Sequence, residues 1–166
     1  TAASLIGRFC PEGKIGVIAG SMHLRDHRER LEGFRAVLAK DFPGLVVLDP
    51  VEGHDETEET RERAAALIVA HPDLAGLYNL GAGNAGLVAA LDASGRAGDI
   101  RVVAHELTAP TRAGLRSGTI DVVLDQNPDG EIRAAIAAAR ALALGGSVPP
   151  DAEPIEIGIF LRDNLR

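Results

Sequence analysis

The chain has 166 residues, of which 46% are hydrophobic, and this is enough for a single domain with a buried core. Its formal net charge of −7 argues against nucleic-acid binding by this chain alone, because phosphate contacts need clustered Lys and Arg, and the lysines are only Lys14 and Lys40. Because Cys10 is the single cysteine, an internal disulfide is excluded. The sequence contains no long uninterrupted apolar segment, so we predict no membrane span.

Apolar runs of strand length alternate with alanine-rich helical segments along the whole chain. The runs are continuous, which is typical of parallel strands covered by helices on both faces. In chain order we expect helix 3–9, strand 14–19, helix 24–38, strand 45–48, helix 55–70, strand 74–80, helix 84–93, strand 100–104, helix 110–117, strand 120–124, helix 128–144 and strand 155–161. The predicted fold class is therefore α/β, a three-layer sandwich with a mainly parallel sheet.

The second predicted helix carries an apolar face. Leu24, Leu31, Phe34, Val37 and Leu38 recur at helical spacing, so we expect them to pack on the sheet. Acidic residues at the start of helix 55–70 suit the N-terminal end of its dipole. Residues 145–154, rich in Gly and Pro, are the candidate linker.

Polar side chains gather in the loops that follow the predicted strands. In open α/β sheets ligands bind outside the carboxyl ends of the strands. Many of these side chains can form two hydrogen bonds at once, which suits a ligand with many hydroxyls. The candidate ligand-binding residues are Ser21, Met22, His23, Arg28, Asn79, Asn84, His105, Glu106 and Gln126. The alternative is that such groups cap helices and loops.

The same residues form a poor catalytic set. No serine lies in a G-x-S-x-G turn, Cys10 lies on the opening helix or at its end, and neither CxxC nor HExxH occurs. His105 and Glu106 are adjacent, so on a strand they would point to opposite faces and only one would face a ligand. We expect no catalytic residue, no metal site and no cofactor.

Residues 81–86, GAGNAG, match the G-x-G-x-x-G dinucleotide fingerprint, and Glu106 follows the next strand, where that fold has its ribose-binding acid. The motif follows the third predicted strand rather than the first, which argues against a nucleotide site. The structural alternative is a tight strand-to-helix turn. An NAD-dependent enzyme stays an alternative function, and it predicts that this chain alone binds NAD.

Residues 14–34, KIGVIAGSMHLRDHRERLEGF, resemble the effector-binding domain of lac-repressor-family transcription regulators, which share the fold of sugar-binding periplasmic proteins. Arg28 and the pair Gly33 and Phe34 fall on family positions, and the similarity continues through residues 74–95 and 102–128. The resemblance implies that Arg28 clamps ligand hydroxyls, that Glu106 takes the place of a ligand-binding Asp, and that Gln126 is a pocket residue near the hinge.

One departure from the family pattern concerns the ligand. The family has Asn-Asp where this chain has Leu80 and Gly81, so that contact would be absent or would pass to Asn79 or Asn84. Glu106 is also longer than the family's Asp. We therefore expect a sugar or related polyol that differs from a simple hexose.

The resemblance implies a ligand-sensing domain of a bacterial regulator, in which sugar binding allosterically controls DNA binding by a cytoplasmic homodimer. Residues 1–166 would be the C-terminal lobe, with 121–148 matching a segment of the family's N-terminal lobe. Helix 128–144 would then pack on its own sheet or on a neighbouring chain. DNA would be bound only through a helix-turn-helix domain outside this chain, and a first residue other than Met leads us to expect a fragment.

A different role for the same fold stays open. The chain would then be part of the solute-binding protein of a sugar transporter. Such a protein needs a secretion signal, so the sequence preceding this chain would separate the two roles.

Overall fold

A seven-stranded sheet forms the centre of the protein in the computed structural model, which describes residues 1–148 and 155–165. The strands are β1 (Gly13–Ala19), β2 (Leu45–Val47), β3 (Val51–Glu52), β4 (Leu74–Asn79), β5 (Arg101–His105), β6 (Val122–Asp125) and β7 (Gly158–Phe160). Their order is β2-β1-β4-β5-β6-β7, and β3 also pairs with β1. The pairings are parallel except that of β6 with β7, so the predicted mainly parallel sheet is confirmed.

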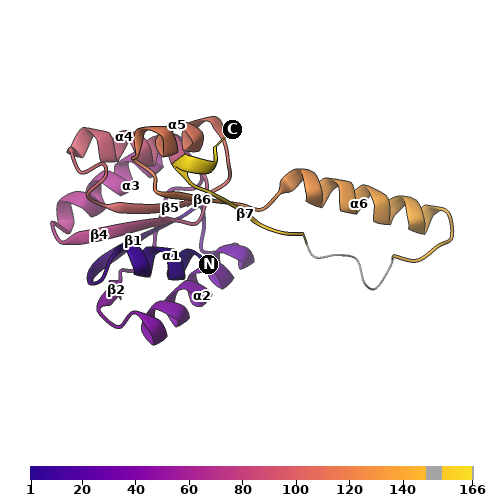
Figure 1. Ribbon diagram of the computed structural model, residues 1–166, viewed down its shortest axis with the longest axis horizontal. Helices are drawn as coiled ribbons and strands as arrows, with labels where there is room; N and C mark the ends of the chain where they lie inside the picture. Colours follow the sequence, from indigo (N-terminus) through magenta and orange to yellow (C-terminus); the bar gives the residue numbers. More distant parts are fainter. Residues whose placement is uncertain (149–154, 166) are drawn as a thin grey trace.

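Helices cover both faces of this sheet (Figure 1). On one face lie α1 (Ala2–Phe9) and α2 (Arg25–Asp41), and on the other lie α3 (Thr57–Ala70), α4 (Asn84–Ser94) and α5 (Ala109–Ser117). A short 3-10 helix, η1 (Arg162–Asn164), follows β7. The three-layer sandwich expected from the sequence is therefore present.

The core is divided by the sheet, because successive side chains of a strand point to opposite faces. Tyr78 and Leu124 belong to the cluster under α1 and α2, whereas Leu77 and Val123 belong to the cluster under α3, α4 and α5. Both faces of the strands are thus buried. This explains why the strands appear in the sequence as continuous apolar runs.

The buried face of α2 differs from the prediction at its first turn. Leu31, Phe34 and Leu38 are buried as expected, but Leu24 is 45% exposed. Leu24 is the N-cap with extended backbone rather than a helical residue, so its side chain does not share the helical face. The imidazole of His27 is buried on that face instead.

Several element boundaries also differ from the prediction. Helix α3 begins at Thr57 rather than at residue 55, because His54 and Asp55 take left-handed φ values of 48° and 61°. Strand β3 was not predicted, since two residues give no periodic signal. Of predicted strand 155–161, only Gly158–Phe160 is a strand. Residues 149–154 of the predicted linker lie outside the described residues.

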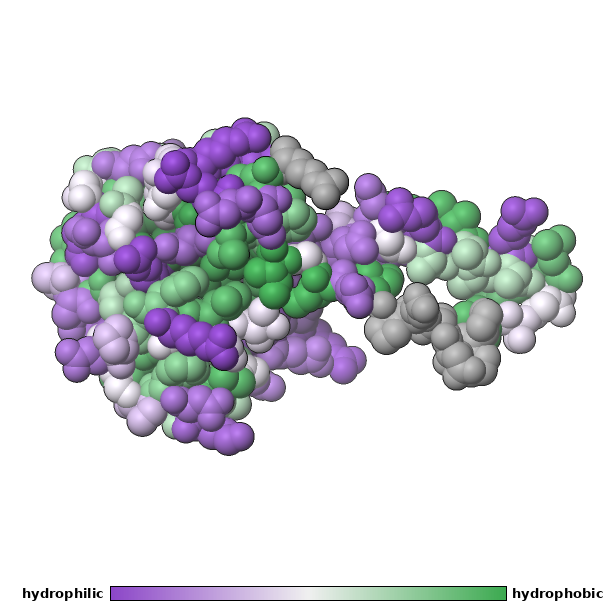
Figure 2. Space-filling view, in the orientation of Figure 1, coloured by the Kyte–Doolittle hydropathy of each residue, from purple (hydrophilic) through white to green (hydrophobic). Residues whose placement is uncertain are grey.

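Helix α6 (Pro128–Ala143) projects away from the sandwich (Figure 1), so the first expected placement, on its own sheet, is wrong, and packing on a neighbouring chain stays a prediction. It buries none of its residues, and Ile132 and Ile136 are exposed. The chain turns away at Asn127, which has a φ of 58° and whose side chain caps the helix by accepting a hydrogen bond from the Gly130 amide. Figure 2 shows hydrophobic residues along this projecting helix.

Candidate ligand-binding site

Strained backbone is concentrated where the strands end. Within residues 1–148 and 155–165, the non-glycine residues with positive φ are His54, Asp55, Glu106 and Asn127. They follow the carboxyl ends of β3, β5 and β6. Such conformations cost roughly 1–3 kcal/mol each and cluster at functional sites. This edge of the sheet is therefore the candidate site.

A chain of hydrogen bonds links three polar side chains at this edge. Arg30 Nη1 donates to the carbonyl oxygen of Leu80 at 2.7 Å, and Nη2 donates to Gln126 Oε1 at 2.9 Å. Gln126 Nε2 in turn donates to Glu106 Oε1 at 2.5 Å. Arg30 thus fixes which end of the Gln126 amide faces Glu106. The result is one preoriented set of polar side chains, held by α2 and by the ends of β4, β5 and β6.

Sequence reasoning missed Arg30. Arg30 lies three residues after His27 and four before Phe34, and both of these side chains are buried against the sheet. Residues at this spacing share a helix face, but Arg28 in turn lies three residues before Leu31, which is also buried. Helical spacing therefore does not separate the two arginines, and only the fold shows that Arg30 reaches the strand ends.

Arg28 lies against the loop that follows β1. Its Nη1 donates to the carbonyl oxygens of Met22 and His23, at 3.2 and 2.8 Å. The structure therefore brings Arg28 together with the predicted residues Met22 and His23, but not with Gln126 and Glu106.

A second contact to this loop comes from Glu52, which the sequence prediction did not include. The Met22 amide donates to Glu52 Oε1 at 2.5 Å, and Ser21 Oγ donates to the same oxygen at 3.4 Å. The hydrogen bond from Met22 is the main reason that the pKa of Glu52 is lowered. The predicted residues Ser21, Met22 and His23 thus form a fixed rim at the end of β1.

Asn79 and Asn84 stabilise the turn between β4 and α4, residues 80–83, through buried hydrogen bonds. Asn79 Nδ2 donates to Ala82 O and to Asn84 Oδ1, both at 2.9 Å, and Asn84 Nδ2 donates to His105 O at 3.1 Å. Both asparagines are buried. Their amides are thus used inside the protein rather than presented to solvent.

The glycines of residues 81–86 have packing reasons of their own. Gly83 caps α4 in the left-handed conformation, with a φ of 75°. A Cβ on Gly81 would lie 2.6 Å from the Gly20 amide nitrogen, and one on Gly86 would lie 1.9 Å from the Thr57 carbonyl oxygen. The close approach of α4 to α3 and of β4 to the β1 loop accounts for these glycines without a nucleotide.

A small pocket opens beside this turn. It has a volume of about 280 Å³ and is lined by Thr57, Ala82, Gly83, Asn84, Ala85, Glu106, Thr108 and Pro110. Glu106 therefore faces the open edge of the sheet from the side of α3, α4 and α5.

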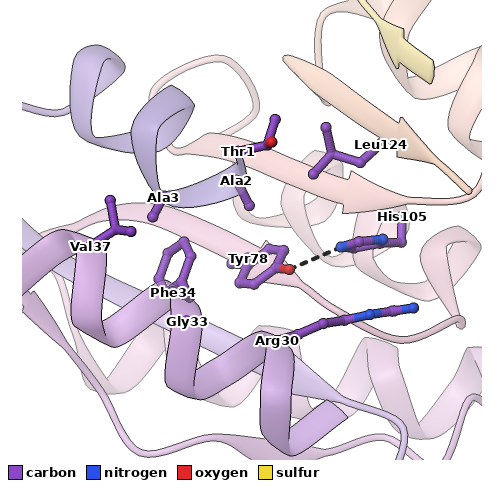
Figure 3. A pocket seen from close by; sticks show the side chains of 10 residues that line it. All are labelled: Thr1, Ala2, Ala3, Arg30, Gly33, Phe34, Val37, Tyr78, His105 and Leu124. Atoms are coloured by element: carbon purple, nitrogen blue, oxygen red, sulfur yellow. Dashed lines mark hydrogen bonds between the residues drawn. The ribbon is translucent and has the colours of Figure 1, made fainter. Parts of the chain in front are cut away.

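His105 points to the other side of the sheet (Figure 3). Its Nε2 lies 2.9 Å from the hydroxyl oxygen of Tyr78, whose ring stacks on Phe34 with centroids 4.5 Å apart. Burial lowers the pKa of His105 to about 3 and raises that of Tyr78 to about 12, so both side chains are neutral at physiological pH. His105 and Glu106 thus lie on opposite sides of the sheet, and which of them faces a ligand stays a prediction.

A pocket of about 340 Å³ lies beside this aromatic cluster, with Arg30 and Leu124 in its lining (Figure 3). The Nδ1 atom of His105 is buried and has no hydrogen-bond partner among the described residues. Those residues also contain no cluster of three or more His, Cys, Asp or Glu arranged to hold a metal ion. In the same part of the chain, no helix combines the length and apolar character needed to cross a bilayer.

Comparison with known proteins identifies relatives of this arrangement. Residues 1–147 match the family described as periplasmic binding protein domain. The D-ribose/D-allose-binding protein of Pseudomonas aeruginosa is 29% identical over 133 residues, which are 75% of this chain and 40% of that protein. The chain therefore spans less than half the length of this curated relative.

Solved structures share the fold. GanP, a glucose-galactose binding protein from Geobacillus stearothermophilus, matches with a TM-score of 0.87 and 20% identity, over 99% of this chain and 60% of GanP. A solute-binding protein of an ABC transporter from Burkholderia graminis, in complex with D-arabinose, matches with a TM-score of 0.88 and 22% identity, over 98% of this chain and 58% of that one. All three relatives are binding proteins by name.

Proposed function

The chain belongs to the family of periplasmic binding protein domains, and from this premise we propose that it is one lobe of a two-lobed protein that binds a sugar or related polyol. The observation that carries the proposal is the preoriented set of Arg30, Gln126 and Glu106 at the carboxyl edge of the sheet. Its carboxylate and amide suit hydroxyl groups, which both donate and accept hydrogen bonds. Nothing in this binding requires a chemical step.

Preorientation matters to affinity. Arg30 is held by Leu80 and Gln126 before a ligand arrives, and Gln126 is held by Glu106. Side chains that are already ordered lose less conformational entropy when a ligand binds. A second lobe closing over this edge would exclude water and strengthen the same hydrogen bonds.

The role that the relatives favour is that of a solute-binding protein for a sugar transporter. The curated relative is named for ribose and allose, and one structural relative is a transporter's solute-binding protein. In this role the protein would be exported and would deliver its sugar to a membrane partner.

The second candidate is the effector-binding lobe of a lac-repressor-family regulator. The observation that favours it is the resemblance of residues 14–34, including the pair Gly33 and Phe34. The protein would then be a cytoplasmic homodimer that binds DNA through a helix-turn-helix domain, with sugar binding changing its operator affinity. Such coupling between sites is typically about 1–3 kcal/mol.

Calorimetric titration of the full-length protein tests sugar binding. The panel contains D-ribose, D-allose, D-arabinose, D-glucose, D-galactose and NAD. We expect a sugar to bind, and Glu106→Ala to weaken it at least tenfold, because a hydrogen bond to a charged group contributes about 1.5–3 kcal/mol. Glu58→Ala is the matched control, since Glu58 pairs with Arg61 on the exposed side of α3.

Binding of NAD in place of a sugar would instead support the alternative of a dinucleotide-binding enzyme. The two roles of a sugar-binding protein are separated by the sequence that precedes this lobe and by cell fractionation. A secretion signal with export supports the transporter role, and a helix-turn-helix with sugar-dependent DNA binding supports the regulator.

A further inference from the structure

The carboxylate of Asp55 occupies the space of two missing side chains at the strand ends. A Cβ on Gly81 would lie 2.7 Å from Asp55 Oδ1, and a Cβ on Gly20 would lie 2.4 Å from both carboxylate oxygens. Gly20 follows β1 and Gly81 follows β4, the neighbouring strand. The carboxylate of Asp55 therefore lies where a side chain of residue 81 would be if that residue were not glycine.

The surrounding backbone holds this carboxylate in place. Asp55 Oδ1 accepts a hydrogen bond from the Ala82 amide at 2.7 Å. Two consecutive left-handed residues, His54 and Asp55, set the direction of the loop. Asp55 is nevertheless exposed, and its Oδ2 accepts no hydrogen bond from the other described residues. One oxygen thus fixes the side chain and the other is available.

Asp55 and Glu106 both adjoin the turn at Ala82. Asp55 binds the Ala82 amide, and Glu106 lines the pocket that Ala82 and Gly83 also line. Ionised carboxylates accept hydrogen bonds but donate none. The positive charge of Arg30 is paired with Asp26, with Nη2 and Oδ2 3.6 Å apart, and its Nη atoms already donate to Leu80 and Gln126. A ligand group at this turn must therefore donate, and a negative group there meets like charge.

We propose that Asp55 is a specificity-determining residue of the sugar site, which selects ligands that present hydroxyl or amino groups to the Ala82 turn and rejects acidic sugars. The inference rests on the proposed function and names the ligand class of that same site. Discrimination of this kind combines an attractive contact for one ligand with repulsion of its competitor.

The test compares sugars that differ in charge on one ring. The full-length protein and its Asp55→Asn variant are titrated with D-glucose, D-glucosamine and D-glucuronic acid, together with the neutral sugar that binds best. Asn keeps an acceptor for the Ala82 amide but removes the negative charge. The variant therefore distinguishes the effect of the charge from that of the hydrogen bond to Ala82. Glu56→Gln is the control, because Glu56 is the next residue and its side chain is exposed.

For the unaltered protein we expect glucuronic acid to bind at least tenfold more weakly than the neutral sugar. Asp55→Asn should weaken binding of the neutral sugar about tenfold, as expected for the loss of a hydrogen bond to a charged group. It should also reduce the difference in affinity between the neutral sugar and glucuronic acid. Thermal unfolding should be unchanged within a few degrees, and Glu56→Gln should leave all affinities as they were.

Two results overturn the inference in different ways. If a neutral sugar binds but Asp55→Asn keeps the same affinities and the same discrimination, Asp55 only clamps the turn, and the sugar-binding function stands. If the unaltered protein binds glucuronic acid more tightly than the neutral sugar, Asp55 does not reject acidic sugars, and the sugar-binding function again stands. If no sugar of either panel binds, the proposed function fails and the inference fails with it.

Discussion

Two arginines on α2 illustrate how position on a helix decides a residue's role. Arg30 reaches Gln126 across the strand ends, whereas Arg28 holds the carbonyl groups of Met22 and His23. We expect Arg30→Ala to weaken sugar binding at least tenfold and Arg28→Ala to weaken it about threefold, through loop order alone. Calorimetric titration of both variants decides this. A larger loss in Arg28→Ala would restore the assignment made from sequence.

The imidazole of His105 makes stability depend on pH. Burial is the main cause that lowers its pKa from 6.5 to about 3. Between these values the unfolded chain binds a proton that the folded protein does not, so the free energy of unfolding falls as the pH falls, by up to about 1.4 kcal/mol per pH unit. The contribution is fully present above pH 6.5.

The substitution His105→Phe removes this proton-binding group. We expect the decline in stability between about pH 6 and pH 4 to become shallower in the variant, as measured by urea unfolding at each pH. If the free energy of unfolding falls equally steeply with pH in both proteins, His105 gains its proton in the folded state over the same pH range as in the unfolded chain.

At the scale of elements, the contact of α3 with α4 depends on Gly86. A Cβ there would lie 1.9 Å from the Thr57 carbonyl oxygen, so Gly86→Ala forces the helices apart and should cost about 3 kcal/mol. Gly95→Ala is the matched comparison at the other end of α4, where no atom lies nearby and the φ of 68° alone costs about 1 kcal/mol. Urea unfolding of the two variants measures the difference, and equal losses would contradict the packing argument.

The sequence predicts the elements well where their physical signals are local. Continuous apolar runs identify the main strands because both faces of the sheet are buried, and Gly95 ends its helix in the left-handed conformation as such glycines do. The signals fail where tertiary contacts decide. Asp55 lies in a loop held by the Ala82 amide, and this contact across 27 positions leaves no pattern in the sequence.

The candidate site is predictable only in outline. Ligands of open α/β sheets bind at the carboxyl edge, and this rule finds Glu106 and Gln126. It does not tell which polar groups are used inside the protein, as Asn79 and Asn84 are, because their burial depends on the fold of the turn. Roles in ligand binding stay predictions for all of these residues.

For the whole molecule, we expect association with other chains to depend on the projecting helix α6, which buries none of its residues. Its groove is lined by Arg133, Ile136, Ala137, Arg140, Ala141 and Leu144. Apolar surface of this kind favours self-association. We expect this chain alone to associate with increasing concentration in sedimentation experiments, and Ile136→Glu to reduce the effect.

The free energy of unfolding should change by less than about 0.5 kcal/mol in Ile136→Glu, because Ile136 is 63% exposed. Ile136→Leu keeps the apolar surface and serves as the control. Association that is the same in all three proteins would show that α6 is not the contact.

The antiparallel strand β7 has a consequence for the order in which the sheet assembles. Leu124 of β6 pairs with Ile159 of β7, and all of α6 lies between them in sequence. Joining these neighbours closes a long loop, and the entropy lost on closure is offset by only a short ladder of hydrogen bonds. The parallel strands and their helices follow one another closely and carry the core. We therefore expect β7 to be the last strand to join the parallel strands and the first to separate from them.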